Sequence, residues 1–533
     1  MTKTEGFGRL FQNFENVIAP KECKMTGTVP KYLKGTMVRN GPGMFEIGDS
    51  KYNHWFDGMA YIQRYHFQDG KMFYSARYLE SEDYLENMKK QRIVRSGFAT
   101  TGFPDPCKTV YQRFFSHFFG EDPKHDNANV SFAEVGDGVY AVTETPQMIR
   151  IDLDTLKPAG TADMTDYIAL NTCTAHQLLD DAGNVFNVGS KFGKDAFYVF
   201  AITKNPLDVK GAQSGHSIED TKIVGTVPCS ETFHPSYYHS FGMSQNYLLL
   251  FESPVRLDIK KILMRKFTFV SYGECLYWKK NVDVKVLIVD KRTGKQKSIK
   301  YTANPFFTFH HANSFEKDGC LVVDYCRMEN AGNFETLLME NMKDGTFQKN
   351  PNFLPYLTRM IIPLEIPSDA KTGDDLLAGL AWAKGCKAEL RKNGSVHLTE
   401  KRLCEHTMEF PRYHSEKINM REYRYCYGSS VLGKAADNDL EGVIKVDVQG
   451  GKPKVWKREN QFQVCAEPIF VPDPNGVEED DGILLVPIMT LRDGENPFVV
   501  ILNAHDLKEI ARYTIPEARI PLGFHALYKK RFG

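Results

Sequence analysis

The chain has 533 residues, which is long for one globular domain but suits a repeat fold or a large β architecture. Hydrophobic residues make up 42% of it and aromatic residues 12%, enough for a large packed core. The 67 Lys and Arg residues balance the 67 Asp and Glu residues, so no net field attracts nucleic acid, and a nucleic-acid-binding function is disfavoured.

Cysteine spacing and hydropathy indicate the expected compartment. The eleven cysteines are odd in number, scattered and never spaced as Cys-x-x-Cys, so neither a zinc cluster nor a disulfide framework is indicated. Residues 1–17 lack the apolar core and cleavage site of a signal peptide. No stretch reaches the ~18 consecutive apolar residues of a membrane-spanning helix. We therefore expect a cytoplasmic protein.

The first expected helix covers residues 107–120. Aromatic side chains recur there at helical spacing, at Tyr111, Phe114, Phe115, Phe118 and Phe119. Lys108, Gln112 and Arg113 lie away from that stripe, which is typical of a helix at a membrane interface; a core helix is the alternative. A second basic and apolar segment, residues 258–272, is a candidate to flank it. Cys107 is a candidate lipidation site.

Most of the remaining sequence predicts short strands, because runs rich in Val, Ile, Tyr and Phe alternate with Gly, Asp, Asn and Pro. One hairpin pattern recurs, in which an apolar pair and a polar residue end a strand and polar residues turn the chain. It occurs at residues 151–160 and around Asp290, Asp447 and Asn503. Such repeats predict an all-β propeller with roughly 40–50 residues or more per blade, so that the 533 residues hold about seven blades plus long insertions. We expect one domain over residues 1–533; a pair of sandwich domains is the alternative.

Four of the fifteen histidines share a distinctive setting, inside apolar, strand-like segments with aromatic or small neighbours. They are His176, His239, His310 and His525. We expect each ring to point into a buried space. A single buried histidine is more often a hydrogen-bonded core residue than a metal ligand, so only the set as a whole suggests a metal site.

Three glutamates lie in similar segments: Glu144, Glu409 and Glu467. A carboxylate buried without a partner costs several kcal/mol or becomes protonated. An imidazole N–H is the obvious partner, because a metal-bound histidine needs an acceptor for its second ring nitrogen. Four histidines and three glutamates therefore form a coherent set; separate core hydrogen bonds are the alternative.

The spacing of these residues supports a shared centre. From His176, the steps to His239, His310, Glu409, Glu467 and His525 are 63, 71, 99, 58 and 58 residues. Steps of about one blade place each residue on an inner strand that faces the propeller axis. Spacing does not identify the metal: four neutral imidazoles suit iron, copper, nickel or zinc, and the carboxylate of the facial triad is missing.

The sequence resembles the carotenoid cleavage oxygenases nearly from end to end, in particular the animal branch with the β-carotene oxygenases and the retinal pigment epithelium isomerohydrolase. The motifs that carry the resemblance are RNGPGMFE (39–46), HWFDG (54–58), PDPCK (104–108), FHHANSFE (309–316) and GFHALY (523–528). Within the family, the chain looks closest to the insect carotenoid isomerooxygenases. The resemblance implies a seven-bladed β-propeller with a dome of helices and loops over its top face.

The resemblance also implies roles for the candidate residues. His176, His239, His310 and His525 would bind Fe(II). Glu144, Glu409 and Glu467 would hold His239, His310 and His525 respectively, which leaves His176 without a glutamate. By family position, the residues expected to line the substrate tunnel are Phe56, Phe98, Thr143, Tyr237, Tyr272, Phe309 and Phe410. Aromatic faces stabilise positive charge, so the six aromatic residues of this set, with Thr143 beside Glu144, are candidates to assist isomerisation of a polyene; plain apolar lining is the alternative.

The implied activity is cleavage of a carotenoid double bond by O2 into two aldehydes, coupled to trans-to-cis isomerisation of one half. Because the substrate dissolves in membranes, residues 107–120 are expected to give peripheral membrane contact, and residues 258–272 are a second candidate. Three alternatives remain: a retinyl ester isomerohydrolase, a non-catalytic carotenoid- or retinoid-binding propeller, and a zinc hydrolase.

Overall fold

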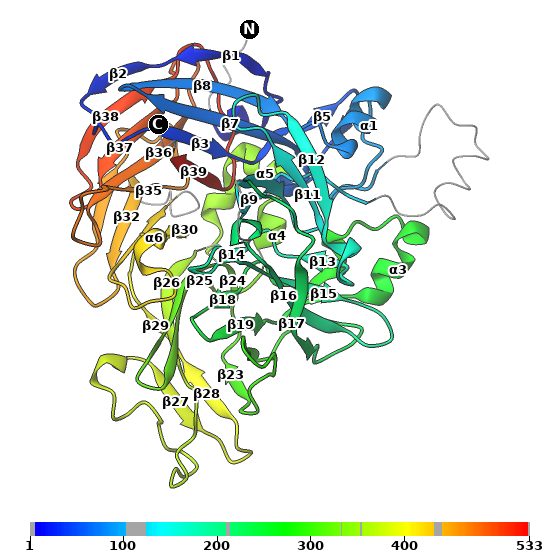
Figure 1. Ribbon diagram of the computed structural model, residues 1–533. Coiled ribbons are helices and arrows are strands. Elements are labelled where there is room, and N and C mark those ends of the chain that lie inside the picture. The colour runs from blue at the N-terminus through cyan, green and yellow to red at the C-terminus, as the bar shows by residue number, and fades with distance from the viewer. Residues whose placement is uncertain are drawn as a thin grey trace.

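The computed structural model describes residues 6–102, 124–208, 214–331, 333–351, 354–430 and 440–530. Most of its strands form seven sheets of four to six strands each, which are almost entirely antiparallel and are arranged around a common axis (Figure 1). This is the predicted seven-bladed β-propeller, rather than two sandwich domains. The expected helix over residues 107–120, with Cys107, lies outside the described residues.

Blades 1 to 3 come from the two chain ends and the first half of the sequence. From inner to outer strand, blade 1 consists of β39 (Ala526–Lys530), β3 (Gly35–Arg39), β7 (Met59–Gln68), β8 (Lys71–Tyr78) and β1 (Val17–Glu22), with β4 (Pro42–Met44) beside β7. Blade 2 consists of β9 (Ser131–Val135), β10 (Gly138–Val142), β11 (Gln147–Ile151) and β12 (Pro158–Asp163). Blade 3 consists of β13 (Thr172–Cys173) and β14 (Leu178–Leu179), both paired with β15 (Val185–Lys191), then β16 (Phe197–Thr203) and β17 (Thr221–Pro228).

Blades 4 and 5 are linked because the connection between two strands of blade 5 adds two strands to the sheet of blade 4. Blade 4 consists of β18 (Gly242–Met243), β19 (Tyr247–Glu252), β22 (Val284–Asp290) and β23 (Tyr301–Ala303). Its sheet is extended by β28 (Val396–Thr399) and β27 (Lys387–Leu390), and β28 pairs with β23 in parallel. Blade 5 consists of β24 (Phe307–Lys317), β25 (Cys320–Met328), β26 (Tyr356–Pro363) and β29 (Lys401–Arg402).

Blades 6 and 7 complete the ring. Blade 6 consists of β30 (Glu409–Arg412), β31 (Tyr425–Ser429), β32 (Glu441–Asp447) and β33 (Lys454–Lys457). Blade 7 consists of β34 (Gln463–Cys465) and β35 (Ile469–Pro472), both paired with β36 (Gly482–Thr490), then β37 (Phe498–Asn503), β38 (Glu509–Thr514) and β2 (Lys24–Gly27).

Both chain ends close the propeller. The C-terminal strand β39 supplies the inner strand of blade 1, and the N-terminal strand β2 supplies the outer strand of blade 7. Each end is therefore paired with strands from the opposite end of the chain. Ring closure does not depend on a covalent bond, since backbone hydrogen bonds hold these strands in register.

The recurring hairpin pattern marks the outer turns of four blades. Asp290, Asp447 and Asn503 each end the strand before a blade's outer hairpin turn, and Asp152 directly follows such a strand. In each case the side-chain oxygen accepts a hydrogen bond from the backbone N–H two residues on. Such side chains mimic a backbone turn, which explains why Asp or Asn recurs at this position.

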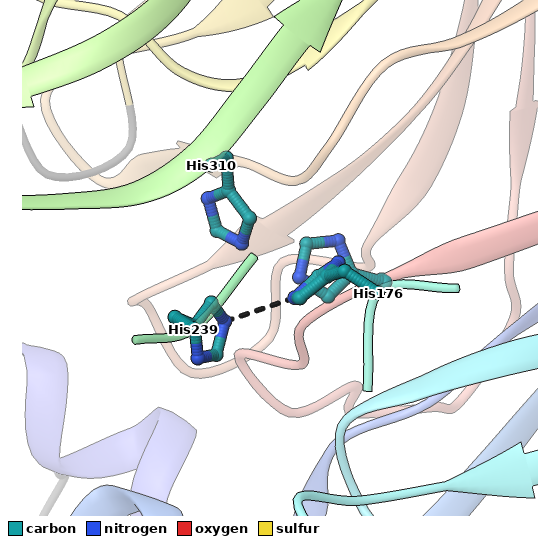
Figure 2. Close-up of side chains that lie close together, drawn as sticks. His176, His239 and His310 are labelled. Carbon is teal, nitrogen blue, oxygen red and sulfur yellow. Dashed lines mark hydrogen bonds between the residues drawn. The ribbon is translucent and has the colours of Figure 1, made fainter. Parts of the chain in front are cut away.

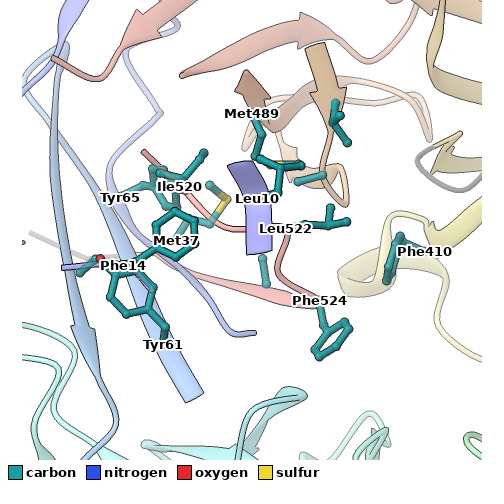
Figure 3. Packing of buried hydrophobic residues seen from close by; sticks show 14 of the residues in the cluster. Leu10, Phe14, Met37, Tyr61, Tyr65, Phe410, Met489, Ile520, Leu522 and Phe524 are labelled. Atoms are coloured by element: carbon teal, nitrogen blue, oxygen red, sulfur yellow. The ribbon is translucent and has the colours of Figure 1, made fainter. Parts of the chain in front are cut away.

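The middle strands are buried on both faces, because a neighbouring blade covers each side. In β36 every residue after Gly482 is buried, without the alternation of a half-exposed strand. The largest buried cluster lies between blades 7 and 1 and includes Leu10, Met37, Tyr65, Met489 and Leu522 (Figure 3). This cluster continues to Phe410 and Phe524, so the packed core extends to the axis.

The predicted dome consists of short helices in the long connections between strands. These are α1 (Glu82–Lys90), α3 (Ile259–Thr268), α4 (Asn333–Thr336) and α5 (Met339–Asp344), with β20 (Val255–Leu257) and β21 (Leu276–Trp278) on either side of α3. Within the part of the chain that the structure describes, no helix has the length and apolar character needed to cross a bilayer. The ten described cysteines are all buried and unpaired.

Candidate metal centre

Four histidines from four blades converge on the propeller axis. His310 lies in β24, His176 follows β13, His239 precedes β18, and His525 directly precedes β39. One ring nitrogen from each of these residues lies within 4.8 Å of the others. Figure 2 shows the rings of His176, His239 and His310 turned toward one another. Residues up to 349 positions apart thus surround one small space. His525 reaches His176 because β39, which directly follows His525, pairs with β3 in blade 1.

The donor set fits a metal ion. His310 Nε2 is buried and has no hydrogen-bond partner among the described residues, and the centroid of its ring lies 4.8, 5.1 and 4.8 Å from those of His176, His239 and His525. Nitrogens that bind one ion at ~2.1 Å lie at most about 4.2 Å apart, so a small contraction allows all four to reach it. Burial, and then the neighbouring rings, lower the pKa of His176 well below its usual value, which favours the neutral form that binds metal.

Three of the histidines each contact a glutamate through the ring nitrogen that faces away from the centre. The Nδ1 atoms of His239, His310 and His525 lie 2.7, 2.5 and 2.9 Å from oxygens of Glu144, Glu409 and Glu467 respectively. This contact fixes which nitrogen of each ring faces the centre. His176 has no glutamate partner among the described residues, and its Nε2 lies 2.9 Å from His239 Nε2. The three pairings are those that the family resemblance implies.

The three glutamates differ in their surroundings. Glu409 is 1% exposed, and its Oε2 accepts hydrogen bonds from His310 and from the Phe410 N–H. Glu144 is 30% exposed and lines the adjacent cavity, where the Tyr237 hydroxyl donates to its Oε1 at 2.8 Å. Burial raises the pKa of Tyr237 well above its usual value, so this hydroxyl remains a donor.

Within the described part of the chain, Glu467 is the one of the three glutamates that pairs with an arginine. Arg412 donates to Oε1 through Nε and to Oε2 through Nη2, both at 2.9 Å. Burial on its own would raise the pKa of Glu467, but Arg412 and His525 outweigh it and hold the pKa at about 2. The sequence-based argument missed Arg412, although a charged residue inside the apolar segment HTMEFPRY was the available signal.

A cavity of about 640 Å³ is lined in part by three of the four histidines, His239, His310 and His525. All seven residues expected to line a substrate tunnel do line it: Phe56, Phe98, Thr143, Tyr237, Tyr272, Phe309 and Phe410. Aromatic rings surround the metal end, where Phe309 lies 5.1 Å from the His239 ring and Phe410 lies 5.4 Å from the His310 ring. The volume is that of a pocket for a small organic ligand, and the lining suits an extended apolar molecule.

The comparisons with known proteins agree with this geometry. A family model described as retinal pigment epithelial membrane protein matches residues 10–530. Mouse β,β-carotene 15,15'-dioxygenase is 33% identical over 523 residues, which cover 97% of this chain and 90% of that protein. The chain belongs to the carotenoid oxygenase family. Human mitochondrial carotenoid-cleaving dioxygenase, another member, is 32% identical over 521 residues, covering 95% and 88% of the two chains.

Solved structures of the carotenoid oxygenase family share the fold. A variant of Synechocystis apocarotenoid oxygenase superposes with a TM-score of 0.76 at 22% identity, covering 99% of this chain and 100% of that one. A cobalt-substituted form of the same Synechocystis enzyme gives a TM-score of 0.75 at 22% identity, with coverage of 99% and 100%. At this identity the likeness establishes the propeller architecture.

Proposed function

We propose that this protein is a non-haem iron(II) dioxygenase that cleaves a carotenoid polyene with O2 into retinal-type aldehydes. The observation that carries the proposal is the four-histidine centre at the end of an aromatic cavity. The relatives named as carotenoid dioxygenases support the choice of substrate and reaction. In the balanced reaction one C=C bond and the O–O bond break, two C=O bonds form, and no proton or external reductant is consumed.

The protein's own residues serve to bind, orient and exclude water. Iron(II), held by His176, His239, His310 and His525, would supply the activation of O2. A polyene offers no acidic or basic group, so the three glutamates have no proton to transfer to it and instead fix the histidine rings. Phe309 and Phe410 border the centre and keep the reacting double bond in an apolar environment.

We also propose that cleavage is coupled to trans-to-cis isomerisation of one product half. Rotation about a double bond requires transient loss of its bond order, through a cationic or radical polyene. Phe56, Phe98, Phe309 and Tyr237 line the cavity, and an aromatic face turned toward the polyene is able to stabilise positive charge on it. Thr143 lies beside Glu144 on the same wall.

Incubation with β-carotene and with zeaxanthin, in air and without oxygen, tests the proposed reaction. In air we expect two aldehyde molecules per carotenoid molecule, one of which carries a cis double bond. Without oxygen we expect no product. With ¹⁸O2, both aldehyde oxygens should carry the label. Chromatography and mass spectrometry of the products provide the measurement. Label from water in one aldehyde, or hydrolysis of a retinyl ester under anaerobic conditions, would contradict the dioxygenase assignment.

We propose further that α3 contacts a membrane. Its outer face carries Leu263 at 70% exposure and Phe267 at 55%, and Phe269 just after the helix is 61% exposed. The exposed lysines Lys260 and Lys261 lie on the same short helix. Such a basic, apolar surface is typical of interfacial binding. Tyr272 follows α3 and lines the cavity, so this surface lies near a route for an apolar substrate.

Replacement of both Leu263 and Phe267 by aspartate should weaken binding to vesicles of phosphatidylcholine and phosphatidylserine. We expect a fall of roughly tenfold or more in the bound fraction, since burial of such side chains contributes about 1.5–3 kcal/mol each. Sedimentation with the vesicles measures it. Val477, which is 78% exposed in a loop of blade 7, offers the control V477D. Equal binding by the double variant and the wild type would refute the contact.

A further inference from the structure

The inner strand of blade 6 contains a β-bulge at the metal centre. Glu409 pairs with Ser429 and Arg412 pairs with Tyr427, so three steps along β30 match two steps along β31. Phe410 has a φ of 56°, a conformation that bulky residues rarely adopt. In a regular strand, residues three apart face opposite sides, whereas the extra residue here turns Glu409 and Arg412 to the same side. The bulge therefore brings a cation to the centre.

The Arg412 guanidinium makes three contacts there. Two parallel hydrogen bonds join it to both oxygens of Glu467, and a third runs from Nη2 to the backbone oxygen of Ala526 at 2.9 Å. The Ala526 N–H in turn donates to Glu467 Oε2 at 2.7 Å. A planar guanidinium fork suits this bidentate geometry, which a single ammonium group does not reproduce. Arg412, Glu467 and Ala526 thus form a closed ring of hydrogen bonds.

This ring links three blades at the point where the propeller closes. Arg412 belongs to blade 6, Glu467 to blade 7, and Ala526 to the first position of β39 in blade 1. Ala526 directly follows His525. On the other side of His525, Arg39 donates to the backbone oxygens of Pro521 and Gly523. The segment that carries His525 is not itself a strand, and these side chains fix its position together with backbone hydrogen bonds to Asn40.

We propose that Arg412 is a positioning residue of the metal centre, whose guanidinium fork fixes Glu467 and the start of β39 and thereby sets the ring of His525. This inference rests on the proposed metal-binding function. Arg412 is neither one of the four candidate ligands nor one of the residues that line the cavity, so its role is exerted through Glu467. The other two histidine–glutamate pairs have no arginine on the glutamate among the described residues.

Co(II) binding to the full-length protein tests the proposal. The variants are Arg412→Met, which removes the fork and the charge, and Arg412→Lys, which keeps only the charge. The control is Arg424→Met, because Arg424 also pairs with a carboxylate, Asp447, through two nitrogens in blade 6, but away from the histidines. The measurements are the visible absorption spectrum of bound Co(II), its rate of loss to a chelator, and thermal unfolding of the metal-free protein.

We expect both Arg412 variants to lose Co(II) about tenfold faster or more and to show an altered spectrum, while R424M matches the wild type in both. Thermal unfolding of the metal-free variants identifies any that fail to fold. If R412M does not fold, the result for R412K, the milder change, decides whether Arg412 positions the metal centre. Wild-type behaviour of R412K would show that charge alone matters and would overturn the positioning role, as would wild-type behaviour of R412M. If the wild type itself binds no Co(II), the proposed metal centre fails instead.

Discussion

Replacement of His310 by alanine should abolish both metal binding and carotenoid cleavage. The centroid of this ring lies close to those of the other three, His176, His239 and His525, at 4.8, 5.1 and 4.8 Å. Its Nε2 has no protein partner among the described residues, so the ion is the group that it is placed to bind. We expect metal content after loading with Fe(II) to fall from about one ion per chain to below about a tenth, because ligand deletion removes binding free energy directly.

The adjacent residue provides a matched control. His311 lies next to His310 in β24, but its Nδ1 is 2.8 Å from the Ser240 hydroxyl and its ring stacks on Phe251, away from the centre. His311→Ala should retain the metal. Metal analysis and product chromatography are to be run on both variants. Full activity of H310A, or equal metal loss in H311A, would refute the four-histidine centre.

Loss of His310 also leaves Glu409 buried without its imidazole. Removal of one partner from a buried pair costs about 3–5 kcal/mol, so H310A should unfold at a lower temperature than the wild type. The double variant H310A/E409Q removes that unpaired charge and should recover part of the stability without recovering the metal. This pattern separates loss of a ligand from loss of the fold.

The hairpins could be predicted from the sequence because their cause is local. An Asp or Asn at the end of a strand accepts from the backbone two residues later, so the same short pattern marks the outer turn of four blades. The convergence of the histidines and glutamates could be predicted because burial of a carboxylate demands a donor. The resemblance to a known family supplied the individual pairings.

Other features were out of reach because they depend on pairing between distant parts of the chain. No local pattern shows that β39 enters blade 1 or that β2 enters blade 7. Arg412 was missed for a related reason. The two-residue period of a strand places residues 409 and 412 on opposite faces, and only the bulge seen in the β30–β31 register reverses this.

Glu409→Gln should weaken metal binding without destabilising the metal-free protein. Glu409 is 1% exposed, and its Oε1 has no hydrogen-bond partner among the described residues. The amide keeps an oxygen for His310 Nδ1 but removes the negative charge that balances a dication. We therefore expect metal affinity to fall by roughly 10–100-fold, as is typical for partners of metal ligands.

Without metal, the same substitution removes a buried charge whose desolvation opposes folding, so metal-free E409Q should unfold at the same or a higher temperature than the metal-free wild type. Thermal unfolding with and without Fe(II) measures both effects. Glu252 is the matched control, since it is fully buried but bonded to Tyr198 and Ser230 away from the centre. E252Q should destabilise both forms and leave the gain in unfolding temperature on metal binding unchanged. If E409Q is destabilised alike with and without metal, Glu409 is an ordinary core residue, and the carboxylate's link to the metal through His310 is wrong.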